Sequence, residues 1–408
     1  MTDTFGGVDE ESEDEVAESW YTRSVWSRTS SVAPSLSSAA TSWSRPRSSV
    51  ASSPQTVIQQ PSTAVPHPLL APLHAFISPV DPSTRFTDLV EIAEGESGSV
   101  YAARIPQEPS PPAPPLGTER PIPAGMSHVA IKRIALPRAP SSLLSIKIAS
   151  LLHELTLLKN LEHEHILLLD GVYAHTAIAL DTSLWIRMEL MERSLADVIA
   201  LVAEGLALQE RILGRFTSDV LLGLDYLQKQ RIAHRDIRSD NLLLNVAGVV
   251  KIADFSNAIR VPENAPMVTG AVGVIYWQAP EMRTGPYDAL KVDVWSVGAT
   301  VWELVETVPP FSIPASPSSQ TVFLPPNSNH LGLQWPPLSH PGHYSKGFHE
   351  FLRLCGMDAA TRPCPEELLN TQFIRNACGR AVIRQLHAQC RSMEEAIVAR
   401  ENAVSVES

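Results

Sequence analysis

Three oxygen-bearing side chains near the middle of the chain are of types that can bind a metal ion. Asp236 and Asn241 lie in "HRDIRSDN", and Asp254 follows in "KIADFSN". Carboxylate and amide oxygens are hard donors that suit Mg²⁺, which binds phosphates and offsets their charge. A single acid in a loop is usually solvated or caps a helix, but that interpretation does not easily explain all three residues at this spacing.

Two further segments carry residues suited to phosphate groups. In "AEGESGSV", Gly95 and Gly98 would let backbone N–H groups approach phosphate oxygens, although a hairpin turn with two glycines is common. Lys132 in "VAIK" lies on a predicted strand, and Glu154 in "LLHELTLL" lies on the helix predicted to follow. A fixed carboxylate would set the position of a phosphate-binding lysine. An exposed lysine and an exposed glutamate are the alternative interpretation.

The elements that would position these residues fall into two groups along the chain. Strands are predicted over 88–105 (two strands and a turn), 128–136, 166–175 and 183–190, with an amphipathic helix over 141–162. Beyond Leu190 the pattern is mostly helical, with a nearly apolar helix over 291–307 that should be buried. This order predicts an α+β protein of two lobes with a cleft between them. The small lobe would hold a five-stranded antiparallel sheet and one helix, and the larger lobe would be mostly helical.

Composition divides the chain further. Residues 1–85 are predicted to be a disordered tail, acidic at its start and rich in Ser and Pro afterwards. An ordered domain is predicted over 86–375, interrupted by Pro-rich surface loops at 106–123 and 309–345. A helical tail is predicted over 376–408.

Charge and cysteine content exclude several classes of protein. The formal net charge is −12 and no basic block is present, so no nucleic-acid partner is expected. No apolar run reaches the roughly 18 residues of a membrane helix, and the acidic start argues against a secretory signal. The four cysteines lack metal-ligand or redox spacing. A cytoplasmic protein without membrane partners is therefore predicted.

Taken in order along 86–375, these motifs resemble those of a eukaryotic protein kinase of the serine/threonine type, closest in wording to the PAK group. "YWQAPE" (276–281) resembles the end of a kinase activation segment. The resemblance implies a two-lobed protein kinase fold, ATP and Mg²⁺ as cofactors, and proteins phosphorylated on Ser or Thr in intracellular signalling as substrates.

The resemblance also implies a role for each candidate residue. Asp236 is expected to accept or orient the proton of the substrate hydroxyl, with Lys132, Arg238 and Glu154 as further catalytic residues. The implied nucleotide-binding residues are Ala93, Glu94, Gly95, Gly98, Val100, Ala130, Lys132, Met188, Glu189, Met191 and Leu243. The implied metal ligands are Asn241 and Asp254.

Other residues are implied to have structural or regulatory roles. Asp293 should anchor the catalytic loop from the apolar helix, and Glu281 should pair with Arg362. Thr269 lies next to the position of the activating threonine of PAK-type kinases. Phosphate added there by an upstream kinase or by the chain itself would be within reach of Arg235. An ordinary loop threonine is the alternative.

Several departures from the family pattern bear on activity. Arg238 replaces the usual lysine, Ala93 replaces a glycine, and Val274 replaces a threonine that would bond to the catalytic aspartate. Ser256 replaces a glycine and would be strained if its backbone required a positive φ. An active, slow kinase is predicted, with dual specificity left open. The alternative is a pseudokinase scaffold that binds nucleotide weakly and acts through protein–protein interactions.

Overall fold

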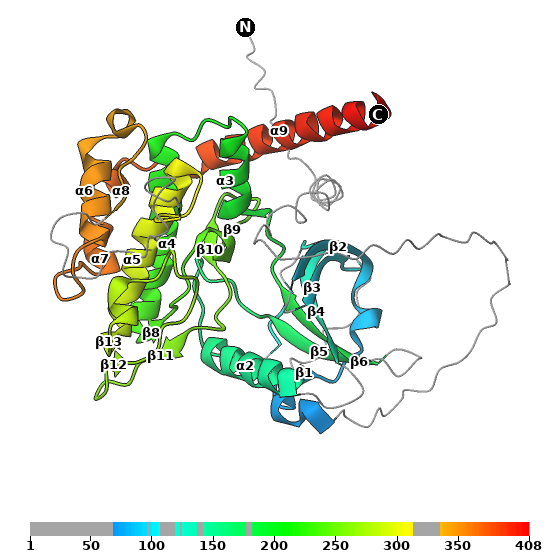
Figure 1. Cartoon of the computed structure of the whole chain (residues 1–408). Helices are drawn as coiled ribbons and strands as arrows, with labels where there is room; N and C mark the ends of the chain where they lie inside the picture. The colour runs from blue at the N-terminus through cyan, green and yellow to red at the C-terminus, as the bar shows by residue number, and fades with distance from the viewer. Residues whose placement is uncertain are drawn as a thin grey trace, which may run out of the picture.

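The computed structural model describes residues 68–95, 98–106, 119–122, 125–136, 142–176, 182–312 and 335–407, which form two lobes (Figure 1). The predictions for residues 1–67, and for most of the two Pro-rich loops, lie outside these described residues.

The small lobe is built on a six-stranded sheet with the order β1-β5-β6-β4-β3-β2. Its strands are β1 (Ile77–Ser78), β2 (Thr87–Gly95), β3 (Gly98–Arg104), β4 (His128–Leu136), β5 (Gly171–Thr176) and β6 (Thr182–Met188). The five predicted strands β2 to β6 pair antiparallel, and β1 adds a parallel strand at the β5 edge. The helix α2 (Ser142–Leu158) packs against this lobe.

The predicted start of order at residue 86 is too late. Residues 68–85 include two 3-10 helices, η2 (Pro68–Leu73) and η3 (Pro82–Thr84), as well as β1. Leu70 and Leu73 are buried in the cluster that contains Leu144 and Ile148 of α2. Two leucines in a Pro-rich stretch give no periodic pattern, so composition alone indicated disorder although tertiary packing orders the segment.

The larger lobe is mostly helical, as predicted. Its helices are α3 (Leu195–Ala203), α4 (Glu210–Lys229), α5 (Ala289–Glu306), α6 (Lys346–Cys355), α7 (Pro365–Leu368), α8 (Gln372–Arg375) and α9 (Arg380–Glu407). Its short strands are β7 (Arg193–Ser194), β8 (Ile232–Ala233), β9 (Leu242–Leu244), β10 (Val250–Ile252), β11 (Ile259–Arg260), β12 (Met267–Val268) and β13 (Tyr287–Asp288). Three 3-10 helices, η4 (Ser239–Asn241), η5 (Pro280–Arg283) and η6 (Pro341–His343), complete the lobe. The helix α5 is buried along most of its length, because its apolar residues occupy every face.

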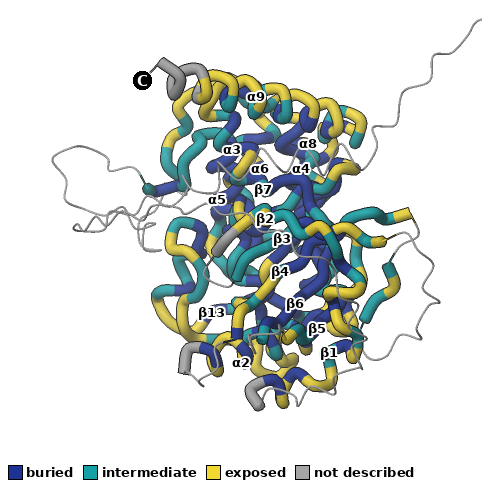
Figure 2. Tube along the Cα trace, turned by 90° about the vertical axis from the view of Figure 1, so that its right-hand side faces the viewer, coloured by how far each residue is buried: buried dark blue, intermediate teal, exposed yellow. Residues whose placement is uncertain are grey.

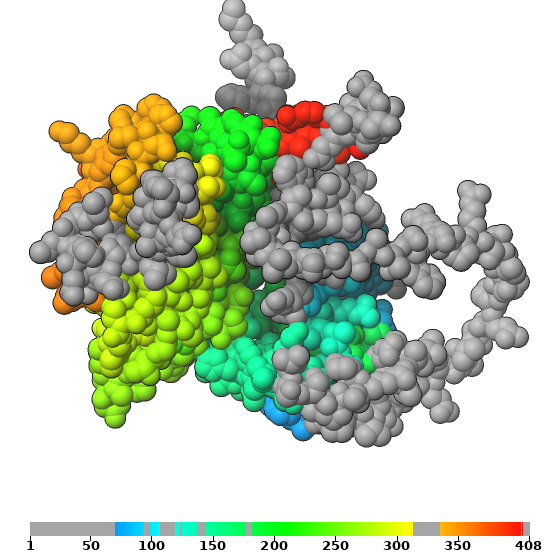
Figure 3. Space-filling view, in the orientation of Figure 1, coloured from blue at the N-terminus to red at the C-terminus, as the bar shows by residue number. Residues whose placement is uncertain are grey.

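Burial is deepest along the centre of each lobe, whereas α9 forms an outer layer whose far side is exposed (Figure 2). The space-filling view shows the two lobes side by side (Figure 3). Residues 189–192 connect them between β6 and β7 and are called the hinge below. In the described part of the chain, no helix has the length and apolar character needed to cross a membrane.

Candidate active site

The central helix α5 holds the loop between β8 and β9, residues 234–241, called the catalytic loop below. Asp293 of α5 is buried, and its carboxylate accepts hydrogen bonds from the backbone N–H groups of His234 (2.8 Å) and Arg235 (2.7 Å). The ring Nε2 of His234 lies 3.0 Å from the carbonyl oxygen of Ala253. The expected anchoring role of Asp293 is therefore confirmed, and the loop is tied to the segment that carries Asp254.

Asp236 lies at the centre of the loop with its carboxylate held on several sides. Asn241 Nδ2 donates to the Asp236 carbonyl (2.8 Å) and to Oδ2 (3.1 Å), and Asn257 Nδ2 donates to the same Oδ2 at 3.4 Å. The guanidinium Nε of Arg238 lies 3.7 Å from Asp236 Oδ1, while its NH1 donates to Asp240. The side chain of Asp236 stays 10% exposed, so its carboxylate is fixed and still accessible.

Gly273 brings the activation segment, residues 254–281, against this carboxylate. Its backbone has φ of +79°, and a Cβ atom there would lie 2.8 Å from Asp236 Oδ1 and 2.7 Å from the Arg235 carbonyl oxygen. Only glycine combines that close approach with a left-handed backbone at little cost. Val274, which lacks the hydroxyl of the family threonine, follows directly.

Asp254 lies between β10 and β11 with a left-handed backbone (φ +62°). Burial raises the pKa of its carboxyl, but hydrogen bonds from the side chain and backbone of Ser256, and the nearby charges of Lys132 and His234, outweigh burial and hold that pKa below its usual value. Asp254 is therefore ionised at neutral pH, as a metal ligand must be.

Lys132 on β4 and Glu154 on α2 lie close to Asp254. Burial raises the pKa of Glu154, the positive charge of Lys132 opposes that rise, and the charge of Asp254 adds to it. Glu154 Oε1 accepts a hydrogen bond from the backbone N–H of Phe255 at 3.2 Å. Within the described residues no direct ion pair joins Lys132 to Glu154, so the two interact at longer range than the sequence analysis anticipated.

A cavity of about 340 Å³ is lined by residues of both lobes; Lys132, Glu154 and Asp254 are not in its lining. Seven of the residues predicted to bind nucleotide line it: Ala93, Val100, Ala130, Met188, Glu189, Met191 and Leu243. Gly98 lies outside this lining and pairs with Gly95 at the β2–β3 turn; a Cβ on Gly98, whose φ is +131°, would lie 2.4 Å from the Arg133 carbonyl oxygen. Glu94 also lies at the end of β2, and its side chain is not among the described ones.

A second cavity, of about 440 Å³, lies behind the hinge and is larger. Its lining is mostly charged and includes Arg120, Glu162, Asp170 and Lys251, whereas the lining of the smaller cavity is mostly apolar; neither lining includes Asp236, Asn241 or Asp254. Apolar walls with a few polar groups are typical of nucleotide pockets. The smaller cavity therefore matches the chemistry better than the larger one.

Asn241 and Asp254 have the donor types that fit Mg²⁺. Asn241 uses its Nδ2 atom on Asp236, which leaves its side-chain carbonyl oxygen for a cation, and Asp254 supplies an ionised carboxylate. No cluster of three or more His, Cys, Asp or Glu side chains with metal-binding geometry occurs in the described ranges. At a nucleotide site Mg²⁺ needs only a few protein ligands, because phosphates and water complete its coordination.

The backbone of Ser256 is not strained. Its φ is not among the positive values of the chain, and its backbone N–H donates to Asp254 Oδ1 at 3.2 Å. The left-handed backbone lies two residues earlier, at Asp254 itself. The condition under which Ser256 would be strained is therefore not met, and the replacement of glycine here gives no reason to expect an inactive segment.

Glu303 is a residue of the site region that the sequence analysis missed. It is 6% exposed on α5 and accepts hydrogen bonds from Ser239 Oγ (2.8 Å) and Trp277 Nε1 (3.0 Å). Burial raises the pKa of this carboxyl to about 7, against those hydrogen bonds. An acid inside a nearly apolar helix was the available signal, because such an acid needs partners when it is buried.

The end of the activation segment is pinned as expected. Arg362 is 1% exposed, and its NH1 and NH2 atoms lie 2.6 and 3.2 Å from the carboxylate oxygens of Glu281. Such a two-point ion pair fixes both position and orientation.

Comparison with known proteins agrees with this geometry. The family model described as the protein kinase domain matches residues 124–374. The chain is 31% identical to the serine/threonine-protein kinase STE20 of Candida glabrata over 72% of this chain and 28% of that protein. It is 29% identical to the serine/threonine-protein kinase pakC of Dictyostelium discoideum over 77% of this chain and 58% of that protein. It is 30% identical to the serine/threonine-protein kinase shk1/pak1 of Schizosaccharomyces pombe over 73% of this chain and 40% of that protein.

The chain thus spans between about a quarter and three-fifths of the length of these relatives. The protein kinase fold implies use of ATP and a divalent metal on protein substrates. With more than half of its residues matched by the family model and its motifs gathered around one cleft, the chain belongs to the protein kinase family.

Proposed function

We propose that this chain is an ATP-dependent serine/threonine kinase that transfers the γ-phosphoryl group of Mg-ATP to Ser or Thr hydroxyls of protein substrates in intracellular signalling. The observation that carries the proposal is the fixed, accessible carboxylate of Asp236, held by Asn241 beside the ionised Asp254. The names of the relatives, all serine/threonine-protein kinases, support the substrate class. The four cysteines are not joined in disulfides and three of them are buried, which supports a cytoplasmic location.

In this proposal each side chain has a defined task. Asp236 accepts or orients the proton of the substrate hydroxyl, and the bonds from Asn241 and Asn257 hold it in place to do so. Asn241 and Asp254 would hold Mg²⁺, which supplies charge neutralisation for the phosphates when bound.

The cationic side chains complete the electrostatics of the proposed transfer. Lys132 would contact the phosphates from β4, with Glu154 of α2 as its electrostatic neighbour. Arg238 keeps a positive charge beside Asp236, although its guanidinium also donates a hydrogen bond to Asp240. Preorganised charge of this kind is the main source of rate enhancement in phosphoryl transfer.

Thr269 is the proposed site of activating phosphorylation, either by an upstream kinase or by the chain itself. It is exposed, and the carbonyl oxygen of the next residue, Gly270, accepts a hydrogen bond from Tyr287 OH at 3.1 Å. Arg235 NH1 lies 3.4 Å from the same hydroxyl, so its guanidinium is close to the segment that carries Thr269. Phosphopeptide mass spectrometry of active protein would detect the modification; full activity of Thr269→Ala would contradict it.

The test of the proposed function compares wild-type protein with Asp236→Asn in transfer of phosphate from Mg-ATP to a degenerate Ser/Thr/Tyr peptide array. Loss of a positioned general base typically costs about 10²–10⁴-fold in rate. Asp225→Asn is a matched control, because Asp225 lies on α4, where it pairs with Lys229 rather than with a residue of the proposed site. We expect transfer to Ser or Thr by wild-type and control proteins only.

Two outcomes would contradict the proposal. Equal transfer by wild type and Asp236→Asn would show that a contaminating kinase or another residue is responsible. Nucleotide binding by thermal shift without transfer by the wild type would favour a pseudokinase scaffold. No feature of the described residues favours that scaffold, because Ser256 is unstrained and the charged groups are retained.

A further inference from the structure

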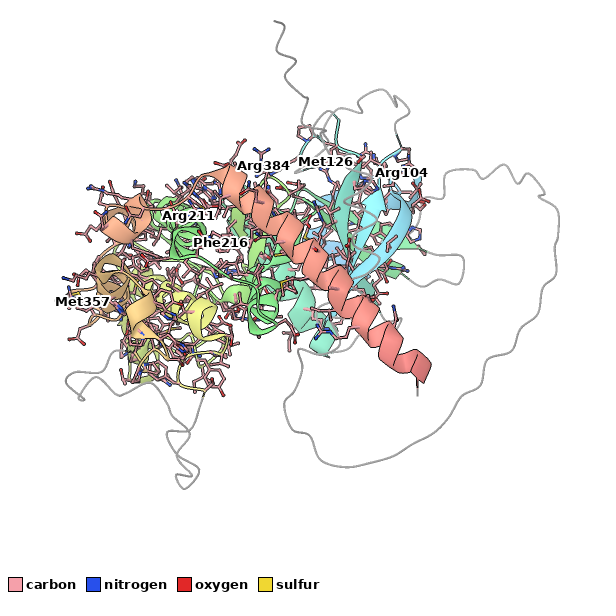
Figure 4. All side chains as sticks on the ribbon, turned by 90° about the horizontal axis from the view of Figure 1, so that it is seen from above. Arg104, Met126, Arg211, Phe216, Met357 and Arg384 are labelled. Carbon is pink, nitrogen blue, oxygen red and sulfur yellow. The ribbon has the colours of Figure 1, made fainter. Side chains whose placement is uncertain are left out.

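The C-terminal helix α9 lies beyond the residues that match the family model, which ends at residue 374. It nevertheless packs on the large lobe through an apolar stripe. Ile383, Leu386, Cys390 and Ile397 are buried in the main core cluster of that lobe. In the view from above, α9 runs diagonally across the foreground from the large lobe, with Arg384 near its start (Figure 4).

One contact connects α9 to the hinge through a single intervening residue. The ring Nε2 of His387 lies 3.0 Å from the carbonyl oxygen of Asn245, directly after β9. The side chain of Asn245 donates to Glu189 Oε1 at 2.9 Å, and Lys251 Nζ binds the other carboxylate oxygen of Glu189 at 2.7 Å. Glu189 is a hinge residue that also lines the nucleotide cavity.

A second contact reaches the hinge from further along α9. The guanidinium of Arg193 is fully buried just beyond the hinge, where Glu394 Oε1 binds it at 2.7 Å and Glu192 Oε1 at 3.2 Å. The cavity lined by Met188 and Met191 is also lined by Arg193, Ser194 and Glu394. Thus a residue outside the family match forms part of the wall of the nucleotide cavity.

We infer that α9 is part of the nucleotide-binding site, and that Glu394 is a positioning residue that fixes the hinge through Arg193. This inference rests on the proposed function, since it assigns the cavity to a nucleotide. A buried guanidinium with one partner removed must find another partner or move, and Arg193 adjoins the hinge directly. Removal of the Glu394 charge should therefore disturb the adenosine-binding end of the cavity.

The sign of the effect separates positioning from simple charge repulsion. Glu394 is an anion, so as a mere neighbour of ATP it would oppose binding, and its neutralisation would strengthen the binding of the anionic nucleotide. Adenosine carries no phosphate and isolates the geometric effect. The positioning role thus predicts weaker adenosine binding in Glu394→Gln.

The experiment uses the full chain and measures the dissociation constants of adenosine and Mg-ATP by calorimetry. We expect Glu394→Gln to weaken adenosine binding roughly three- to tenfold, as for partial loss of a buried charged hydrogen bond. The exposed neighbour Glu395→Gln is the matched control and should stay within about twofold of wild type. Ile383→Val, in the buried stripe near the start of α9, should lower the Tm but leave the adenosine dissociation constant within about twofold.

Three results would overturn the inference. These are unchanged or tighter adenosine binding in Glu394→Gln, an equal loss in Glu395→Gln, or an equal loss in Ile383→Val, which would reduce the effect to stability. Phosphate transfer by wild-type protein is measured in parallel. Adenosine binding without transfer would refute the proposed function alone, whereas transfer with normal adenosine binding by Glu394→Gln would refute the role of α9 alone. A wild type that binds neither adenosine nor ATP would refute both.

Discussion

The catalytic loop and the activation segment meet at Asp236 and Gly273 but are held in different ways. In the catalytic loop His234, Ser239 and Asn241 are buried, and a buried carboxylate of α5 fixes the backbone. This support holds Arg235 in a left-handed conformation, φ +65°, which is costly for a residue with a side chain.

The activation segment is held at its two ends, at Gly273 and by the short strand pairs of β11 with β8 and of β12 with β13. Several of its side chains are nevertheless open: Met267 is 53% exposed, and Val274 and Ile275 are each 37% exposed. Exposed apolar side chains beside a fixed carboxylate are suited to contact with another molecule. The comparison indicates that the groups proposed for the chemistry are preformed, whereas the surface that would receive the proposed protein substrate is left open.

The largest expected effect comes from breaking the support of the catalytic loop. Asp293→Asn replaces one of two acceptor oxygens with a donor, so the N–H of His234 or Arg235 loses its partner in a buried site. We expect the free energy of unfolding to fall by about 2–4 kcal/mol, together with most of the activity. Urea denaturation measures the change.

The control for this variant is Asp288→Asn on the same helix. Asp288 caps α5 by accepting from the N–H of Leu290, and asparagine is an equally good N-cap. A loss of stability in Asp288→Asn as large as that in Asp293→Asn would mean that the catalytic loop has no special dependence on Asp293.

A pH dependence should follow from Glu303, which joins the two regions through Ser239 and Trp277. The folded pKa of about 7 exceeds the ordinary value of 4.5, so between these values the folded chain holds a proton that the unfolded chain releases. The free energy of unfolding should therefore decrease as the pH rises through this window, by about 1–3 kcal/mol, and level off above it.

Glu303→Gln removes the titrating carboxyl, so the free energy of unfolding should decrease less between pH 5 and pH 8. The measurement is urea denaturation of wild type and variant at pH 5 and pH 8, with the exposed Glu395→Gln as control. A wild type and a Glu303→Gln variant with parallel stability curves over this range would contradict the raised pKa.

The activation segment should respond to restoration of a hydroxyl next to Gly273. Val274→Thr supplies a donor or acceptor near the Asp236 carboxylate, and we expect the rate of phosphate transfer to rise by up to about tenfold. Val268→Thr makes the same substitution elsewhere in the segment and should not raise the rate. An unchanged or lower rate in Val274→Thr would show that Asp236 is already fully positioned by Asn241 and Asn257.

The smallest effect is expected at Ser256. Since its backbone is not left-handed, Ser256→Gly relieves no strain, and stability should decrease by no more than about 1 kcal/mol through added chain entropy. Ser256→Ala separates loss of the hydroxyl from backbone freedom. A large gain of activity in Ser256→Gly, but not in Ser256→Ala, would restore the view that serine biases the segment.

Much of the site could be predicted because its members are close in sequence. Asp236 and Asn241 lie five positions apart on one loop, and Asp254 follows after a short hairpin, so local geometry limits where their side chains can be. The strands of the small lobe were predictable for a similar reason, since apolar alternation marks them. The order at Leu70 and Leu73 was not, because a few apolar residues in a Pro-rich segment become ordered only by packing on α2.

The sequence by itself determined the family, the two-lobed fold and seven of the residues that line the cavity between the lobes. Only the tertiary structure decided that Asp254 rather than Ser256 is left-handed, how Glu303 joins Ser239 to Trp277, and that α9 contacts the residue next to the hinge. Arg193 and Glu394 are 201 positions apart, and no local periodicity relates residues at that separation. Their contact depends on the packing of the whole large lobe, which places a buried cation where an acid from α9 meets it in addition to the neighbouring Glu192.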